Sequence, residues 1–208
     1  MGPLPAVTAL AVAALAVAGC DLADAGRGVR TMALLDSTVS VRGPEGFCVD
    51  QQASRPVTGF AVLAGCAVIS DAPLMPAQEG LLTVQFGAPG SATVSGAEAE
   101  LARLLRATQG AALLSATGDP ATISVARVDR AEGVVVVRFS DTAPAPTPGL
   151  EPLEWRAFLD IRGRLTTISL RGFDRAPLPL EQGLRLLAQA VGALRAANAP
   201  PAAAVPPA

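Results

Sequence analysis

The alternation of apolar and polar residues predicts a series of short strands in the first half of the chain. Thr38–Arg42 alternates polar and apolar side chains, as a strand with one buried face does. Phe47–Asp50, Gly59–Ile69 and Leu81–Phe86 are mainly apolar and are also expected to be strands, the second of them interrupted by Gly65. Gly43–Gly46 contains two glycines and a proline and is expected to be a turn.

A second group of strands is predicted in the later half. Thr122–Val128 alternates, Asp129–Gly133 turns the chain, and Val134–Phe139 returns beside it. The last of these starts with a run of valines that does not alternate, which favours a strand covered on both faces. Glu154–Ile161 and Leu165–Leu170 flank a tight turn and form the final expected pair.

Two segments have features of helices. Ser95 and Glu98 have the spacing of a capping box and predict the start of a helix that ends by Gly110. Near the C-terminus, apolar residues at helical spacing predict a helix of about five turns. We expect this stripe to pack on the sheet, with a partner-binding surface as the alternative. The stripe consists of Leu180, Leu184, Leu187, Val191 and Leu194.

These elements define an α+β class. The expected architecture is an antiparallel β-sheet of about six to seven strands, packed against a mid-chain helix and a long C-terminal helix. We expect one domain over residues 37–198. Residues 20–36 are small and polar at their start and are expected to be a tether. Residues 199–208 are rich in Ala and Pro and are expected to be a frayed tail.

The order of the elements resembles the Mog1/PsbP-like fold. In that fold an opening strand carries a Pro-x-Gly-aromatic turn, and a late strand pair leads directly into a C-terminal helix. Pro44-Glu45-Gly46-Phe47 fits the first feature, and Leu165–Phe173 followed by Leu180–Ala197 fits the second. The resemblance implies an assembly or accessory role, as PsbP-like proteins have. It names no reaction, because the fold supports no single chemistry.

The N-terminus resembles that of a bacterial lipoprotein. The apolar run Ala6–Gly19 is shorter than the roughly 20 residues that a membrane-spanning helix needs. It ends in Val17-Ala18-Gly19-Cys20, which fits a lipobox: an aliphatic residue three positions before a cysteine, with small residues between. The resemblance implies a signal peptide over residues 1–19 and acyl chains on Cys20. The alternatives are an ordinary signal peptide cleaved elsewhere and a buried apolar helix.

Acylation of Cys20 would make the lipid bilayer a partner of the protein, because acyl chains on one residue can anchor a domain without a spanning helix. The location implied is the periplasmic side of a membrane in the bacterial cell envelope. Asp21, directly after the cysteine, slightly favours the inner membrane.

Cys48 and Cys66 are the remaining cysteines. In an exported protein two such residues pair naturally as a disulfide. Two buried free thiols are the alternative. A reactive redox pair is disfavoured, because the spacing is not Cys-x-x-Cys and no Lys or His lies nearby to lower a thiol pKa.

The composition excludes several kinds of chemistry. The chain has no His, so Ser-His-Asp, Cys-His and His-metal sites are unavailable. Two cysteines beyond Cys20 are too few for the usual structural zinc site, and we expect no metal or cofactor. The net charge is −2 and the basic residues do not cluster, which gives no support for nucleic-acid binding.

Three classes of function remain. The leading hypothesis is a non-enzymatic lipoprotein that acts as a binding or accessory module, with loop 141–152 and the neighbourhood of Trp155 as its candidate partner surface. Trp155 lies within an apolar strand, however, and is more typical of a core residue. The alternatives are a small-molecule binding protein, with a cavity between sheet and terminal helix, and an envelope hydrolase that uses paired carboxylates. The candidate acids for the hydrolase are Asp50, Asp71, Asp129, Asp141, Asp160 and Asp174.

Overall fold

The computed structural model of the chain describes residues 28–144 and 147–200. Its helices are Cys66–Ile69 (α1), Glu98–Arg106 (α2), Thr108–Leu114 (α3) and Leu180–Ala197 (α4), with short 3-10 turns at Pro56–Thr58 and Pro120–Thr122. Its strands are Gly28–Val29 (β1), Thr31–Leu34 (β2), Val39–Arg42 (β3), Phe47–Arg55 (β4), Phe60–Gly65 (β5), Leu81–Phe86 (β6), Ile123–Ala131 (β7), Val134–Asp141 (β8), Leu150–Ile161 (β9) and Arg164–Phe173 (β10).

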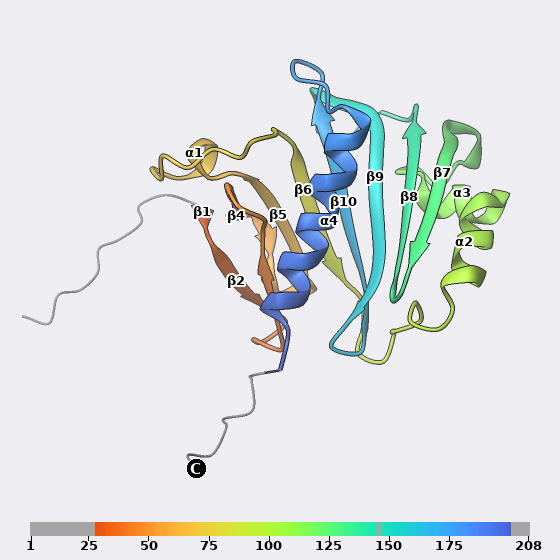
Figure 1. Cartoon of the computed structure of the whole chain (residues 1–208), viewed down its shortest axis with the longest axis horizontal. Coiled ribbons are helices and arrows are strands. Elements are labelled where there is room, and N and C mark those ends of the chain that lie inside the picture. Colours follow the sequence, from red (N-terminus) through yellow and green to blue (C-terminus); the bar gives the residue numbers. More distant parts are fainter. Residues whose placement is uncertain (1–27, 145–146, 201–208) are drawn as a thin grey trace, which may run out of the picture.

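Eight of these strands form one antiparallel sheet in the order β1-β4-β5-β6-β10-β9-β8-β7 (Figure 1). The strands β2 and β3 form a separate hairpin. The expected α+β class, the antiparallel sheet and the long C-terminal helix are confirmed. The main sheet has eight strands instead of six or seven.

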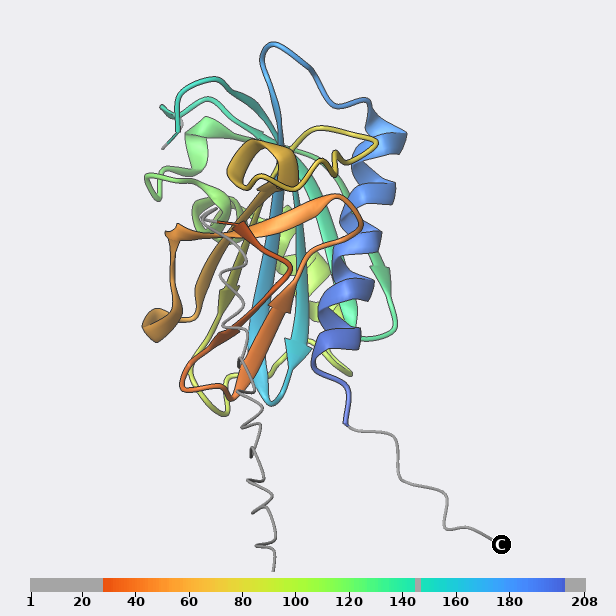
Figure 2. The ribbon, with the colours of Figure 1, turned by 90° about the vertical axis from the view of Figure 1, so that its left-hand side faces the viewer.

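The two faces of the sheet have different covers. The helix α4 and the β2–β3 hairpin cover one face and enclose the larger hydrophobic core. The helices α2 and α3 pack against β7 and β8 on the opposite face. Figure 2 shows α4 on one side of the sheet and α3 on the other. Val134–Val137 was expected to be covered on both faces, but the cover is complete on one face only. Val135 and Val137 are buried under α2, whereas Val134 and Val136 are on the α4 side and are half-buried.

The folded domain starts earlier than expected. Residues 28–36 were assigned to the tether, but Gly28–Val29 pairs with β4 and Thr31–Leu34 pairs with β3. Leu34 is 1% exposed and Met32 packs against the same core. Met32 and Leu34 alternate with other residues over too short a segment to predict a strand, because the residues before them are small and polar. The lipobox, Cys20 and residues 201–208 lie outside the described residues.

Two local predictions were wrong for identifiable reasons. The strand expected over Gly59–Ile69 does break at Gly65, where β5 ends, but the residues after it form α1 instead of continuing the strand. Ser95 does not cap a helix either, since α2 begins at Glu98 and has no side-chain cap. The Glu98 carboxylate instead accepts a hydrogen bond from the backbone N–H of Gly133 at 2.8 Å. This bond ties α2 to the β7–β8 turn, a contact between segments that the local motif could not reveal.

The end of the helical region also differs from the prediction. This region was expected to end by Gly110, but Leu113 and Leu114 complete α3, which follows α2 after a break at Ala107. Leu114 is buried under the β7–β8 hairpin side of the sheet.

The helix α4 is held at both of its ends. Near its start, Gly183 lies directly on the ring of Trp155, and an added Cβ would come within 2.6 Å of two ring atoms. At its end, the Asn198 side chain donates to the carbonyl oxygen of Ser40 at 2.7 Å and accepts from the N–H of Ser40 at 2.9 Å. Glycine and asparagine are therefore both needed to set this helix across the sheet.

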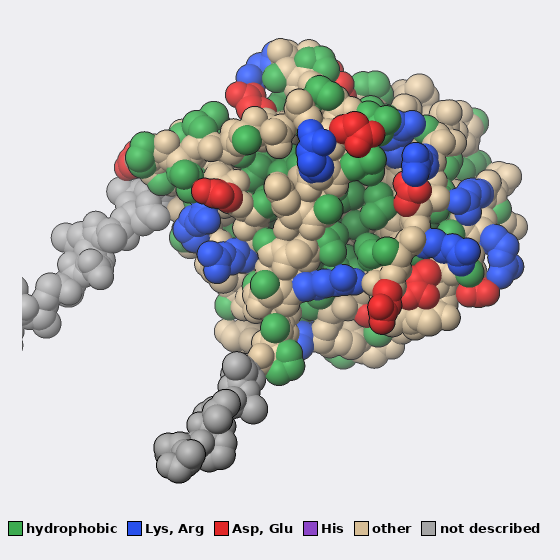
Figure 3. All heavy atoms as spheres, viewed as in Figure 1, with side chains coloured by type: hydrophobic (Ala, Val, Ile, Leu, Met, Phe, Trp, Pro, Cys, Tyr) green, Lys and Arg blue, Asp and Glu red, His purple; other side chains and the backbone are tan. Residues whose placement is uncertain are grey.

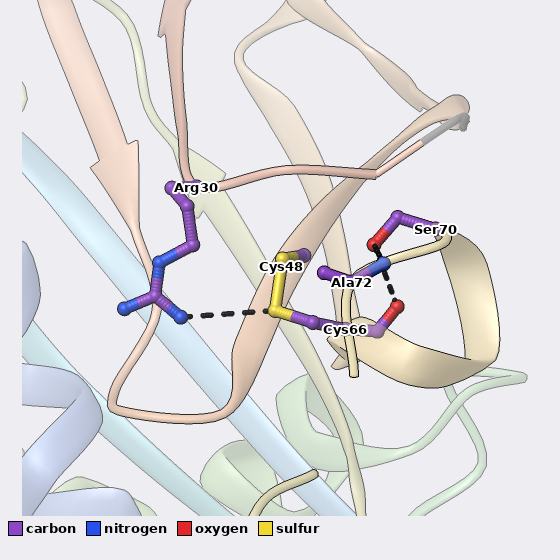
Figure 4. Close-up of a disulfide and its surroundings, with 5 residues drawn as sticks. All are labelled: Arg30, Cys48, Cys66, Ser70 and Ala72. Atoms are coloured by element: carbon purple, nitrogen blue, oxygen red, sulfur yellow. Dashed lines mark hydrogen bonds between the residues drawn. A yellow bond between two sulfur atoms is a disulfide. The ribbon is translucent and has the colours of Figure 1, made fainter. Parts of the chain in front are cut away.

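The disulfide joins the start of β4 to α1 (Figure 4). Cys48 and Cys66 are both buried, and Ile69 packs against them. The guanidinium of Arg30 donates a hydrogen bond to the Sγ atom of Cys66 at 3.7 Å. The predicted pairing of these cysteines is confirmed, and the disulfide holds α1 against the sheet at this end.

Replacing both cysteines, Cys48→Ala with Cys66→Ala, should destabilise the domain. The bridge closes a loop with a sequence separation of 18, and the chain-entropy model gives about 3 kcal/mol for a loop of that size. Urea unfolding of the double variant and of the reduced parent protein should show similar losses. An unchanged unfolding midpoint in both would contradict the structural role of the bridge.

Candidate functional site

An apolar groove of about 280 Å³ lies between α4 and the strands β7 and β8. Figure 3 shows hydrophobic side chains gathered beside α4, with basic and acidic side chains around them. The volume is close to the lower limit of about 300 Å³ for small-molecule sites. The lining residues are Val134 and Val136 from β8, Leu184, Leu187, Ala188 and Val191 from α4, and Asp129 from β7.

The groove is open because α4 does not lie over β8. The helix packs against β3, β9 and β10, so β8 runs beside it. The predicted stripe packs on the sheet through Leu187, Val191 and Leu194, which are buried. Leu184 is only half-buried, and Leu180 is 39% exposed. The packing prediction is therefore confirmed for the later part of the stripe and wrong for Leu180.

Polar groups lie near both ends of the groove. At one end, the guanidinium of Arg195 donates to the carbonyl oxygen of Gly133 at 2.9 Å and links α4 to the β7–β8 turn. Beyond the other end lies Arg138, the next residue of β8 on the α4 face after Val136. Its Nε atom is buried and has no hydrogen-bond partner among the described residues. The same is true of the Nε1 atom of Trp155, its register partner on β9.

The outer rim of the groove carries an ion pair. The Nε atom of Arg127 donates to both carboxylate oxygens of Asp129, at 2.8 and 2.7 Å. The hydrogen bonds to Asp129 and its charge raise the pKa of Arg127, and the charge of Glu181 adds a smaller contribution. Asp129, the acid that lines the groove, is therefore already paired with Arg127.

Asp160 holds a loop in place. Its carboxylate accepts from the backbone N–H groups of Thr93, Val94 and Ser95 at 3.0, 2.9 and 2.8 Å. Burial raises the pKa of this carboxyl, but the three backbone bonds and the Ser95 hydroxyl lower it by more, so the pKa lies below its ordinary value. This candidate acid fixes the segment that leads into α2.

Asp141 has a similar role at the end of β8. It is 2% exposed and accepts from the backbone N–H groups of Ala116 and Ala143, both at 2.9 Å. Burial raises the pKa of Asp141, but these bonds, the Thr122 hydroxyl and the charge of Arg171 lower it to below its ordinary value. The ionised carboxylate joins the end of α3 to the end of β8.

The other four candidate acids lie apart on the fold. Asp50 is buried in β4 and accepts from the backbone N–H groups two and three residues later, at 3.0 and 3.1 Å. Asp129 is paired with Arg127. Asp71 and Asp174 are exposed, one after α1 and the other after β10. These contacts give no support to a catalytic pair of carboxylates.

One charged cluster was missed by the sequence reasoning. Glu154, which is 2% exposed, accepts from Arg156 at 2.7 Å and from Arg171 at 2.6 Å. Arg156 also donates to the Ser169 hydroxyl at 3.0 Å and lies over the ring of Phe139. Each oxygen of the Glu154 carboxylate is already paired with an arginine, so this acid is not free for catalysis. The residues of the cluster lie on three strands. In the sequence, the cluster could have been recognised from two charged residues that alternate with core residues in β9.

The expected partner surface is smaller than predicted. Trp155 is fully buried, which confirms its assignment to the core. The segment 141–152 is not all loop, because Asp141 ends β8 and Leu150 begins β9, and both are buried. Only 142–149 remains between the strands.

No protein-family model matches the chain, and no curated protein matches it. Among residues 28–144 and 147–200, no helix is long and apolar enough to cross a membrane. The same described residues hold no group of three or more His, Cys, Asp or Glu side chains placed to bind a metal ion. The groove beside α4 is therefore the feature from which a function is argued.

Substituting Asp160→Asn should lower the free energy of unfolding at neutral pH by about 1–3 kcal/mol, because backbone N–H groups lose an ionised acceptor. The folded-state pKa of Asp160 is depressed, so its contribution is fully present above the unfolded pKa of about 3.9 and is lost as the pH falls through the folded value. Urea unfolding at several pH values should show the difference between the proteins shrinking in acid. The exposed control Asp174→Asn should have little effect; equal losses in both variants would contradict the loop-holding role.

Proposed function

We propose that the chain is a lipid-anchored binding module on the periplasmic side of a bacterial membrane, and that the groove beside α4 is its binding site. The observation that carries the proposal is the open apolar groove with charged groups at its rim. A concave, mostly apolar surface with a few polar groups is the usual form of a small-molecule site. Of the functions considered from the sequence, small-molecule binding is the one that this surface favours.

The fixed position of α4 supports a preformed site. Gly183 and Asn198 hold the helix at two points, and the groove lies along the helix between them. A site that exists before the ligand arrives avoids the entropy cost of ordering helix and strand on binding. Binding should therefore need little movement of the backbone.

The location is supported by two independent features. The disulfide between Cys48 and Cys66 is typical of an oxidising compartment outside the cytoplasm. The lipobox that ends at Cys20 supports an acyl anchor, and the seven residues 21–27 between it and β1 would reach at most about 25 Å. The domain would thus stay close to the bilayer.

The resemblance to the Mog1/PsbP-like fold is kept as part of this proposal. It is supported by the strand pair β9–β10 and the long helix α4 that follows it. An accessory role, in which a small molecule is held or delivered at the membrane, is consistent with such a fold. The fold itself identifies no ligand.

Substituting Cys20→Ser should remove the anchor. Without acyl chains, the protein should move from the detergent phase to the aqueous phase in Triton X-114 partition of cell envelopes. The neighbouring change Asp21→Asn keeps the cysteine and should stay in the detergent phase. Detergent partition of the Ser variant at the parental level would contradict the anchor.

Substituting Ala188→Phe should fill the groove. Ala188 is exposed and lines it, so the new ring can occupy the space without disturbing the core. In the unanchored Cys20→Ser chain, the neutral fluorescent probe N-phenyl-1-naphthylamine should lose at least about tenfold in affinity, or about 1.4 kcal/mol. Ala196→Phe, an exposed change on α4 away from the lining residues, should retain parental binding. Parental probe affinity in the Ala188 variant would contradict the site.

A further inference from the structure

We propose that the groove takes a free, single-chain carboxylic acid of medium length, with its chain between α4 and β8 and its carboxylate at Arg138. This inference rests on the binding function proposed above and names the class of ligand. Its support comes from the size of the groove, from its lining and from the polar groups at one end.

The size of the groove suits one apolar chain. A volume of about 280 Å³ is small for a molecule with two acyl chains. The lining residues of α4 extend from Leu184 to Val191, about 10 Å along the helix axis. Six of the seven lining side chains are aliphatic, and the seventh, Asp129, is already paired with Arg127. A narrow saturated chain therefore matches both the shape and the chemistry of the lining.

The position of Arg138 suits an acidic head group. It lies two residues beyond Val136 on the same strand, about 6.6 Å further along it, and on the same face. Its Nε–H is buried without an acceptor among the described residues. A buried N–H group without an acceptor is unfavourable, and a carboxylate forms paired hydrogen bonds with a guanidinium.

The nearby groups strengthen this choice. The indole Nε1–H of Trp155, the register partner of Arg138, also lacks an acceptor. Asp129 bonds to Arg127, and among the described residues no hydrogen bond or ion pair joins Glu181 to Arg138. An amphiphile with a cationic head would bring a second positive charge next to Arg138. A carboxylate could instead accept a hydrogen bond from its Nε–H, which has no acceptor among the described residues.

Titration of three amphiphiles with the same chain tests the proposal. Decanoate, decanol and decyltrimethylammonium would be added to the unanchored Cys20→Ser chain below their aggregation concentrations, and displacement of N-phenyl-1-naphthylamine would be measured. We expect decanoate to bind at least about tenfold more tightly than the other two, since a charge-assisted hydrogen bond forms only with the acid. Equal affinity for decanoate and decanol would overturn the proposal.

Arg138→Gln should remove the preference for decanoate and leave the affinity for decanol unchanged. Arg138→Lys keeps the charge without the planar fork and should retain part of the preference. Arg185→Gln, an equal charge change at an exposed residue of α4 outside the lining, is the control and should bind as the parent does. Arg138→Gln could weaken the binding of decanoate and decanol equally, or could unfold the chain. In that case, the preference of the parent protein for decanoate and the affinities of Arg138→Lys decide whether Arg138 binds the carboxylate.

The outcomes separate this inference from the function on which it rests. If Ala188→Phe blocks binding of the neutral probe but the parent shows no preference for the acid, the inference about the ligand is contradicted and the groove remains a binding site. If neither the probe nor the amphiphiles bind, the inference and the proposed function are both contradicted. Binding to phosphatidylglycerol vesicles but not to free decanoate would assign the groove to a bilayer surface, and a dimer abolished by Ala188→Phe would assign it to a second copy. Either result would overturn the proposal.

Discussion

The position of α4 across the sheet is the constraint on which the other features depend. Gly183 allows the helix to rest on the ring of Trp155, and Asn198 bonds to both backbone groups of Ser40 on β3. Two fixed points prevent the helix from rolling toward β8. Because the helix stays over β9 and β10, the apolar side chains on β8 keep an open face, and the groove exists without a ligand to form it.

The acidic residues of the domain are mainly used to hold its parts together. Glu154 pairs with Arg156 on its own strand and with Arg171 on β10, Asp160 fixes the loop before α2, and Asp141 joins α3 to β8. Of the acids considered for the alternative of a hydrolase, Asp50, Asp141 and Asp160 thus accept hydrogen bonds from the backbone. The Nε atom of Arg138 differs from these groups, because it is buried and has no acceptor within residues 28–144 and 147–200.

The sequence predicted the features that depend on local periodicity or on the pairing of very few residues. The helix Leu180–Ala197 has the predicted bounds, because its apolar spacing continues over its whole length. With Cys20 assigned to the lipid anchor, Cys48 and Cys66 had only each other as disulfide partners, and free thiols were the alternative. A cavity between the sheet and the terminal helix was one of the alternatives, but its position beside β8 could not be predicted, since it depends on the contact between Gly183 and Trp155, which lie on different elements. The bond from Glu98 to a distant turn replaced the expected capping box for the same reason.

The most direct test of the central claim is a methyl NMR titration of the unanchored chain with decanoate, with Val and Leu methyl groups labelled. The account predicts that chemical shifts change at Val134, Val136 and Leu184, which line the groove. Methyl groups on the opposite face of the sheet, such as those of Val62 and Leu81, should not change. Shift changes confined to that opposite face, or no changes at saturating ligand, would contradict the claim that the groove beside α4 is the binding site.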